Sequence, residues 1–199
     1  LLADEGVFKG YAALGDSLRP EARGLVAGLA AMGITSVIAS GDRTAAVSEA
    51  AEALGIREYY AEVFPEEKRQ IVLRHKALGQ KVAVVGDGFN DAEALSEADI
   101  GIALRSGTDI AVKASDITLM HSGIAGVAAA VKLAKAIRRV IVENLVWAFG
   151  YNILLIPLAA GAFYPSFGLV IPPYFAGGAM ALSSVSVVFN SLRLRRVKI

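Results

Sequence analysis

The chain has 199 residues, enough for one or two domains, and its mean hydropathy of +0.52 is high for a purely soluble protein. Its formal net charge of +1 leaves no excess of lysine and arginine to cover phosphates, which argues against a nucleic-acid partner. Cysteine is absent, so the chain has no disulfide and no thiolate metal site, and its two histidines, His75 and His121, are predicted to be surface residues. The chain begins LLADEG, without a methionine or a signal-peptide pattern, and we expect it to be a fragment of a longer protein.

Residues 1–125 alternate short apolar runs with helical patterns. Runs rich in Val and Ile predict buried strands at residues 33–40, 81–86, 98–103 and 115–120. Patterns bounded by Pro or Gly predict helices at residues 19–33, 43–56 and 65–79. This alternation predicts an α/β domain whose parallel sheet has helices on both faces. We expect the sheet to be incomplete, because the strand that should precede residue 1 is not in the chain.

A glycine-flanked aspartate, Asp87, follows the second predicted strand. A strand-to-helix turn explains part of this pattern, with Gly86 and Gly88 supplying permissive backbone and Asn90 or Asp91 capping the next helix. The turn does not explain a charge at the carboxyl end of a buried strand, which is where open α/β sheets bind ligands. Two carboxylates beside an asparagine suit Mg²⁺, which shares oxygen ligands with phosphate.

Residues 126–199 are predicted to form a transmembrane helical hairpin. No Asp, Glu, Lys or Arg occurs at residues 144–192. A helical pattern at residues 126–143 passes into an apolar helix that ends near residue 160, and a second apolar helix covers residues 175–192, each near the ~20 residues that cross a bilayer. Three prolines break the segment between them: Pro165, Pro172 and Pro173.

Lysine and arginine flank the outer ends of this hairpin and are absent from its connecting loop. The positive-inside rule therefore predicts that both ends, and with them the α/β part, are cytoplasmic. A buried helical hairpin of a soluble protein is the alternative, which so long an uncharged stretch disfavours. We expect a multi-pass membrane protein, in a bacterial-type plasma membrane, with the lipid bilayer as a partner.

The turn sequence GDGFNDAEAL, residues 86–95, resembles the GDGxNDxxAL hinge motif of P-type ATPases, members of the haloacid dehalogenase superfamily. The following segment ADIGIALRSGTDIAVKASDITLM extends the resemblance. It implies a haloacid dehalogenase-like (Rossmann-like) fold for residues 1–125, as the later part of a phosphorylation domain. It also implies an ATPase that works through an aspartyl phosphate, with Asp87 and Asp91 at the magnesium site and Asn90 supporting the phosphate.

The segment ASGDR, residues 39–43, ends the first predicted strand with a hydroxyl and a glycine, which can hold phosphate oxygens. It resembles the TGDN segment of P-type ATPases, and the resemblance implies a phosphate-binding role for Ser40, Gly41 and Asp42. Arg43 replaces the asparagine of the family pattern, so no role is carried over to that position.

The segment FPEEKRQIV resembles the P-x-x-K segment of the same family, which implies that Lys68 neutralises phosphoryl charge. Alone, Lys68 would be read as a solvated helix charge. The segment GDSLRP resembles the D-x-x-R-P loop near the nucleotide, which implies that Asp16 and Arg19 bind ATP. In isolation it would be only a helix start.

The nucleophile of the family is an aspartate within a DKTGT sequence, and these 199 residues contain no such sequence. We therefore expect the chain to be inactive alone. Its partner would be the remainder of the same ATPase, with the upstream membrane helices and the actuator and nucleotide-binding domains.

Polar residues in the predicted hairpin point to the transported ion. NLVWAFGYNILLIPLAAG and AMALSSVSVVFNSLRL resemble the fifth and sixth membrane helices of copper-exporting heavy-metal ATPases. The resemblance implies that Tyr151, Asn152, Met180 and Ser184 line the copper path. Met180 and Ser184 are four residues apart and share a helical face, and a thioether is a soft ligand that suits Cu(I). Ordinary helix packing explains small and hydroxyl residues equally well.

The sequence thus favours part of an ATP-driven Cu(I) transporter that uses Mg²⁺ and ATP. A transporter of Zn²⁺, Cd²⁺ or Co²⁺ is one alternative, although harder donors are expected for those ions and the hairpin has no carboxylate in its uncharged stretch. The other alternative is a catalytically inactive, membrane-anchored binding or regulatory protein, if the chain is complete as it stands.

Overall fold

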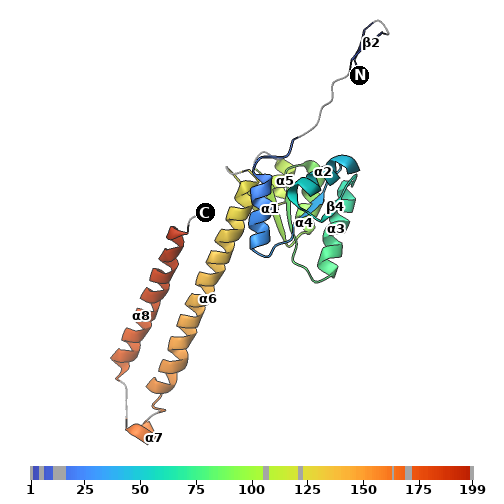
Figure 1. Ribbon diagram of the computed structural model, residues 1–199. Helices are drawn as coiled ribbons and strands as arrows, with labels where there is room; N and C mark the ends of the chain where they lie inside the picture. The colour runs from blue at the N-terminus through green and yellow to red at the C-terminus, as the bar shows by residue number, and fades with distance from the viewer. Residues whose placement is uncertain are drawn as a thin grey trace. The chain divides into compact units, whose positions relative to one another are not determined.

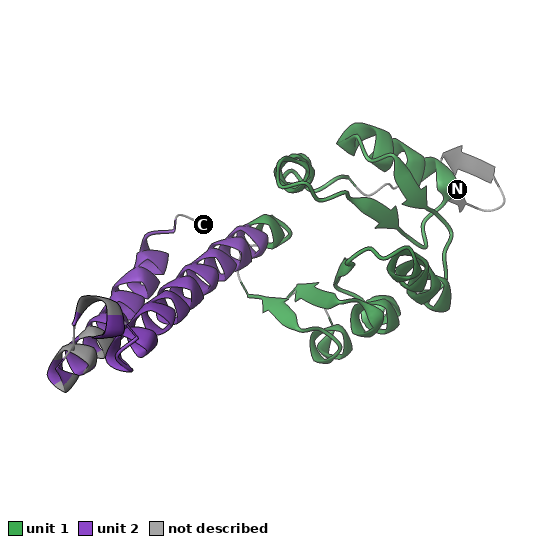
Figure 2. Cartoon of the chain, turned by 90° about the horizontal axis from the view of Figure 1, so that it is seen from below, with its two compact units in different colours: residues 1–128 green, residues 129–199 purple. Residues whose placement is uncertain are grey.

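A computed structural model describes residues 2–4, 7–10, 17–104, 108–120, 123–162, 164–168 and 172–197. They fall into two compact units, residues 1–128 and 129–199, drawn in green and purple in Figure 2. The first is an α/β unit and the second is a helical unit.

Parallel strands form the framework of the α/β unit (Figure 1). β3 (Val37–Ala39) pairs with β4 (Glu58–Tyr60), and β5 (Ala83–Gly86), β6 (Ile100–Leu104) and β7 (Ile117–Leu119) form a second sheet in that order. The four predicted strands and their parallel direction are confirmed. The sequence reasoning misses β4, because its Glu-Tyr-Tyr run contains neither Val nor Ile.

Open strand edges mark the place where the two sheets end. Among the described strands, β3 is bonded to β4 alone, and β5 is bonded to β6 alone. β4 and β7 likewise have one partner each, as every edge strand does, so the expectation of an incomplete sheet stays a prediction. β1 (Leu2–Asp4) and β2 (Val7–Gly10) form a separate antiparallel pair, in a segment for which the sequence reasoning predicts no element.

The predicted helices are confirmed as α1 (Ala22–Ala31), α2 (Thr44–Leu54) and α3 (Pro65–Ala77). α2 stops at Gly55, whose φ of 68° lies in the left-handed region that favours glycine. Three short helical segments lie further along the chain: η1 (Phe89–Asp91), α4 (Ala92–Glu97) and α5 (Asp109–Lys113). The sequence reasoning misses α5, which is barely longer than one turn.

α4 packs against β5 and β6 and supplies the centre of the core. Leu95 of α4 and Ala103 of β6 are almost completely buried. The backbones approach closely here, because a Cβ built on Gly101 would lie 2.6 Å from the carbonyl oxygen of Leu95. A larger residue would not fit at position 101, so the glycine allows the start of β6 to pack directly against α4.

The second unit holds the long helices. α6 (Ala125–Ala159) begins within the first unit and is continuous through the position where an apolar helix is predicted to follow a charged one. α7 (Tyr164–Phe167) is one helical turn within the predicted loop, and α8 (Pro173–Leu192) followed by η2 (Arg193–Arg196) completes the unit. In the part of the chain that the structure describes, α6 is the one helix long and apolar enough to cross a membrane.

Candidate active site

Asp87 follows β5 directly and stands at the carboxyl end of that strand. Its backbone carbonyl accepts a hydrogen bond from the N–H of Thr108 at 2.9 Å, which fixes the turn. Its carboxylate is about half exposed, and Oδ2 lies 3.6 Å from Nη2 of Arg19. The turn therefore holds the backbone of Asp87 while its carboxylate stays accessible to a ligand.

Asp91 has a different environment, because both of its carboxylate oxygens are engaged by the protein. Oδ1 accepts a hydrogen bond from Nζ of Lys68 at 2.8 Å, and Oδ2 accepts one from the N–H of Gly88 at 3.2 Å. The side chains of this ion pair are only 15% and 19% exposed. Lys68 lies in the first turn of α3, so the pair ties that helix to the turn after β5.

Asp91 lies at the expected N-cap position of a helix, but its side chain does not cap that helix. Asp91 is the N-cap residue of α4, yet its side chain makes no capping hydrogen bond to that helix. The carboxylate turns to Lys68 and Gly88 instead. Asp91 therefore orients a cation beside the turn, which a capping aspartate would not do.

Gly86 is required for a reason other than the expected one. The described glycines with positive φ do not include Gly86 or Gly88, so backbone permissiveness is not what this turn needs. A Cβ on Gly86 would lie 2.6 Å from Cβ of Asp91 and 2.9 Å from its carboxyl carbon. The prediction of a permissive backbone was wrong, and the glycine serves close approach.

The loop after β3 folds around the hydroxyl of Ser40. Ser40 Oγ donates a hydrogen bond to Oδ2 of Asp42 at 2.7 Å, and the Asp42 N–H approaches the same Oγ at 3.3 Å. The N–H of Ser40 donates to the carbonyl of Tyr60, and its carbonyl accepts from the N–H of Val63. These contacts fix a hydroxyl and nearby backbone N–H groups at the carboxyl end of a parallel strand, where a phosphate can bind.

Glu62 is a site residue that the sequence reasoning misses. Its Oε1 accepts hydrogen bonds from both the N–H and the hydroxyl of Thr44, each at 3.1 Å, and its own N–H donates to the carbonyl of Asp42. Its φ of 56° is in the left-handed region, where a residue other than glycine carries strain on the order of 1–3 kcal/mol. Glu62 thus links the loop that follows β3 to the first residue of α2. An acidic residue in a loop gives no sequence signal for this role.

The remaining predicted residues of the α/β unit are placed as follows. Arg43 is the N-cap residue of α2 without a side-chain cap, Asn90 is exposed in η1, and a Cβ on Gly41 would lie 3.5 Å from the carbonyl of Val63. Arg19, expected at the nucleotide, lies beside Asp87. Asp16 lies outside the described residues.

Asp87 is the carboxylate of this site that is best suited to bind magnesium. Within the described part of the chain, no three His, Cys, Asp or Glu side chains gather as a metal site. Mg²⁺ does not need such a cage, because it is commonly held by one or two carboxylates, several waters and substrate phosphates. The accessible carboxylate of Asp87 suits that arrangement better than Asp91, whose oxygens already bond Lys68 and Gly88.

Two ionisable groups away from this turn have shifted pKa values. Hydrogen bonds from the N–H of Val82 and from Lys81 hold the pKa of Asp99 below its usual value. The hydrogen bond that the Tyr60 hydroxyl donates to Glu58 raises the pKa of Tyr60. Asp99 joins the segments that lead into β5 and β6, whereas Tyr60 and Glu58 both lie on β4.

The surface prediction for His75 was wrong, and His121 lies outside the described residues. The His75 side chain is 15% exposed, with Nδ1 2.7 Å from Oε1 of Gln80. Its buried Nε2 lies 3.4 Å from Glu58 Oε1 without forming a hydrogen bond. Side-chain contacts with Gln80 and with Glu58 of β4 cover the ring.

In the helical unit the described contacts between α6 and α8 gather near the basic tail. Nδ2 of Asn144 donates to Ser191, Nδ2 of Asn190 donates to Oδ1 of Asn144, and Arg193 bonds Oε2 of Glu143. Of the predicted copper-path residues, Tyr151 lies two helical turns along α6 from Asn144 and beside Asn190 and Arg193.

Those four residues are only partly described. Tyr151 is half-buried and stacks on Trp147 with ring centroids 6.0 Å apart, whereas Asn152 and Ser184 are exposed. The side chain of Met180 lies outside the described residues. The assignment of these four residues to one path therefore stays a prediction from the sequence.

Comparison with known proteins bears on the fold and on the family. Two family models, each described as haloacid dehalogenase-like hydrolase, match residues 3–99 and 69–131. The α/β unit has a haloacid dehalogenase-like fold. The probable copper-transporting ATPase PacS of Synechocystis sp. is 45% identical over 98% of this chain and 26% of its own length. The copper-exporting P-type ATPase of Vibrio cholerae is 44% identical over 100% of this chain and 22% of its own length.

The chain is a homologue of the heavy-metal P-type ATPases. A solved zinc-transporting PIB-type ATPase in the E2.Pi state matches 90% of the chain at 34% identity, with a TM-score of 0.79, over 28% of that structure's own length. The catalytic domain of the CPx-ATPase CopB-B matches 58% of the chain at 36% identity, with a TM-score of 0.55. The chain spans about a quarter of the length of the curated relatives it matches.

Proposed function

We propose that the chain is part of an ATP-driven Cu(I) transporter that works through an aspartyl phosphate. The observation that carries the proposal is the part-buried Lys68–Asp91 ion pair beside the half-exposed carboxylate of Asp87. This arrangement places one fixed cation, Lys68, and one solvent-accessible carboxylate, Asp87, at the carboxyl end of a parallel strand. It is what a site for a phosphoryl group and a magnesium ion requires.

The residues would divide the work as their contacts suggest. Lys68, held by Asp91, would offset the charge of the phosphoryl oxygens. Asp87 would hold Mg²⁺, which when bound offsets further phosphate charge. The Ser40 hydroxyl and the backbone N–H groups of Gly41 and Asp42 would bind phosphoryl oxygens, and Asn90 would contact the phosphate from the exposed side of η1. We assign Asp16 and Arg19 to the nucleotide.

The phosphorylated aspartate would come from the remainder of the same ATPase. The 199 residues contain no DKTGT sequence, and the curated relatives are about four times as long. The single-sided strands β3 and β5 would each accept a further strand. Upstream membrane helices and the actuator and nucleotide-binding domains would complete the machine, so the chain alone would not turn over ATP.

Copper is the proposed ion because its chemistry suits the hairpin. The relatives that cover the chain almost completely are named as copper-transporting. The uncharged stretch has no carboxylate, and Met180 is its single sulfur. A thioether is a soft donor that selects Cu(I). Tyr151, Asn152 and Ser184 would complete the path.

Zinc is a second candidate, with cadmium or cobalt in the same class. The observation that favours it is the likeness to the solved zinc-transporting PIB-type ATPase, with its TM-score of 0.79. The lower identity of 34%, compared with 45% to PacS, is the reason we place copper first.

Metal-stimulated ATP hydrolysis by the protein expressed from its complete gene tests this choice. We expect stimulation by Cu(I), and loss of that stimulation in Met180→Leu, which keeps volume and apolarity while deleting the sulfur. Met120→Leu, in the other unit, is the matched control and should behave as wild type. Stimulation by Zn²⁺ and not by Cu(I) would move the protein to the second candidate, and stimulation by neither would overturn both.

The hairpin topology has its own test, because the chain has no cysteine. Single cysteines at Ser166 and at Arg196 are expected to react with an impermeant thiol reagent from opposite sides of sealed vesicles, with Arg196 on the cytoplasmic side. Labelling of both cysteines from one side would contradict the predicted transmembrane hairpin.

A further inference from the structure

A groove lies between α6 and α8 at the end of the hairpin that carries the basic tail. It is a shallow, open groove of about 360 Å³, lined by Trp147, Tyr151, Ser186, Phe189, Asn190 and Arg193. One wall is aromatic, and the rim carries an amide, a hydroxyl and a guanidinium. A groove with these two sides fits an amphipathic ligand.

Polar contacts join α6 to the end of α8 and to η2 beside the groove. Asn144 bonds both Ser191 and Asn190 across the two helices at 3.0 Å. Arg193 uses one nitrogen, Nη1, to bond both Glu143 and Asn190. A guanidinium has five N–H donors, and the Arg193 side chain is 66% exposed, so it can also bind an anion at the rim.

The aromatic wall is open to the surroundings. Trp147 is 54% exposed and Phe189 is 68% exposed. Trp147 lies one helical turn inward from Glu143, which puts the indole near the boundary between the charged and uncharged parts of α6. Tryptophan and tyrosine are enriched at that depth in membrane proteins, because their amphipathic rings sit at the headgroup level.

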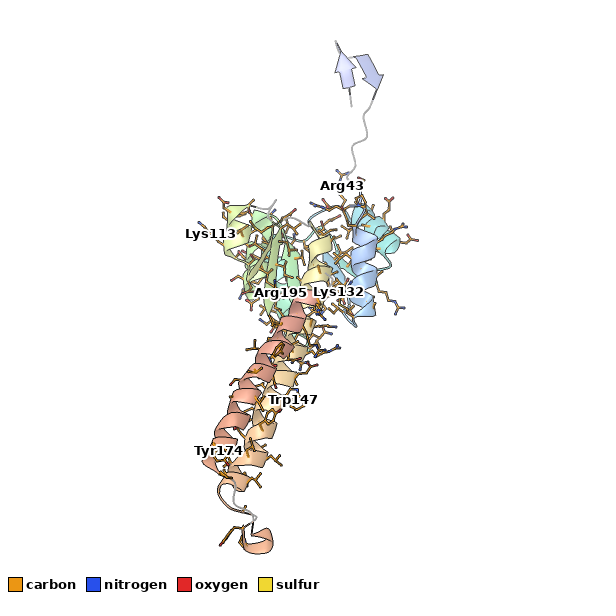
Figure 3. All side chains as sticks on the ribbon, turned by 90° about the vertical axis from the view of Figure 1, so that its left-hand side faces the viewer. Arg43, Lys113, Lys132, Trp147, Tyr174 and Arg195 are labelled. Atoms are coloured by element: carbon orange, nitrogen blue, oxygen red, sulfur yellow. The ribbon has the colours of Figure 1, made fainter. Side chains whose placement is uncertain are left out.

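Positive charge surrounds this end of the hairpin. Beyond residue 125 the sequence has one acidic residue, Glu143, against the following basic ones: Lys132, Lys135, Arg138, Arg139, Arg193, Arg195, Arg196 and Lys198. Figure 3 shows Lys132 and Arg195 towards one end of the hairpin, Tyr174 towards the other, and Trp147 between them. The charge at the groove is complementary to an anion and not to a zwitterion.

We propose that this groove binds an anionic phospholipid, with its phosphate at Arg193 and Asn190 and its acyl chains along Trp147 and Phe189. The proposal rests on the membrane-spanning hairpin proposed above. A soluble phosphate would not use the aromatic wall, and a zwitterionic headgroup would bring its own cation against the arginines. An anionic lipid suits both parts of the groove, because its phosphate can bond Arg193 and its acyl chains can contact the aromatic rings.

Fluorescence of Trp147 tests the proposal directly, because it is the only tryptophan among the 199 residues. The chain is reconstituted in phosphatidylcholine vesicles that contain an equal mole fraction of brominated phosphatidylglycerol or brominated phosphatidylcholine. We expect quenching by the anionic lipid to correspond to an about fivefold local enrichment, the preference that one basic residue at a membrane surface confers. Arg193→Gln should lower the enrichment by about that factor, whatever preference the other basic residues of the tail confer.

Two matched variants separate lipid binding from helix pairing. Glu143→Gln breaks the same ion pair while keeping the guanidinium, and it should retain the preference for the anionic lipid. Arg23→Gln, on α1 of the other unit, should also retain it. Loss of the preference in Glu143→Gln would show that the ion pair and not the arginine matters, and would overturn the proposal.

The wild-type chain gives the remaining outcomes. Equal quenching by the two brominated lipids would overturn the proposal while leaving the hairpin in place. Absence of quenching from a chain that floats with the vesicles would mean that protein covers the groove, which also overturns it. A chain that does not float with vesicles would overturn the proposed hairpin, and the lipid site with it.

Discussion

The two units hold their polar side chains in opposite ways. In the α/β unit, residues far apart in the sequence are joined in a small volume, as Lys68 is to Asp91 and Arg19 is to Asp87. In the helical unit, the described contacts between α6 and α8 lie near one end, around Asn144. The first unit has a site whose geometry is set by its own contacts. The long helices of the second unit follow from their apolar composition, and the ion path proposed for them rests on residue types and not on described contacts.

The largest effect is expected where the α/β unit is most tightly built. Gly86→Ala would place a Cβ 2.6 Å from Cβ of Asp91, so the ion pair with Lys68 must move. A displacement of about 1 Å at a reacting site costs on the order of a hundredfold in rate, and we expect ATPase activity of the complete protein to fall by about that factor. Gly24→Ala, with no atom within 4 Å of the new Cβ, is the control. Full activity in Gly86→Ala would show that the turn is looser than its contacts suggest.

A smaller effect is expected behind the Ser40 loop. Glu62→Ala removes the acceptor of the Thr44 N–H and hydroxyl and should destabilise the α/β unit by about 1–2 kcal/mol, as loss of a helix cap does. Glu62→Gly loses the same acceptor but relieves the left-handed backbone, so it should cost less than Glu62→Ala. Urea unfolding measures both. Equal losses would mean that the φ of Glu62 carries no strain.

The hairpin should respond to its polar end more weakly. Asn144→Ala removes two hydrogen bonds between α6 and α8, and such bonds in membrane proteins average about 0.6 kcal/mol each, so we expect a loss of about 1 kcal/mol. Ser186→Ala is the control, because Ser186 bonds the carbonyl of Leu182 within its own helix. Unfolding in mixed micelles would reveal the difference. A larger loss in Ser186→Ala would contradict the assigned role of Asn144.

The smallest effect is the acid dependence of the framework. The pKa of Asp99 is lower in the folded protein than in the unfolded chain, where it is about 3.9. Its contribution to stability is therefore fully present above that value and is lost as the pH falls through the lower, folded-state pKa. Melting temperature measured on either side of this window should fall less steeply with acid in Asp99→Asn than in wild type. An unchanged slope would remove Asp99 from the acid response.

The sequence was sufficient for the main helices and for four of the strands, although it missed β1, β2, β4 and α5. Periodicity and glycine stops place α1, α2 and α3, because they reflect local backbone preferences. Motif order places Lys68 near the turn after β5. The sequence was not sufficient for roles that depend on contacts, such as the engagement of both Asp91 oxygens, the close approach at Gly86 and the left-handed Glu62. Those features exist only once distant segments have met.

The central claim is a division of labour in which Asp87 faces magnesium and Asp91 holds Lys68. Magnesium titration of phosphoenzyme turnover in the complete protein tests it most directly. We expect Asp87→Asn to raise the Mg²⁺ concentration for half-maximal turnover by about tenfold or more, because an anionic ligand is lost. Asp91→Asn should lower the maximal rate, since Lys68 loses its anionic partner, while the Mg²⁺ dependence stays as in wild type. An equal shift of the Mg²⁺ dependence in the two variants would contradict the account.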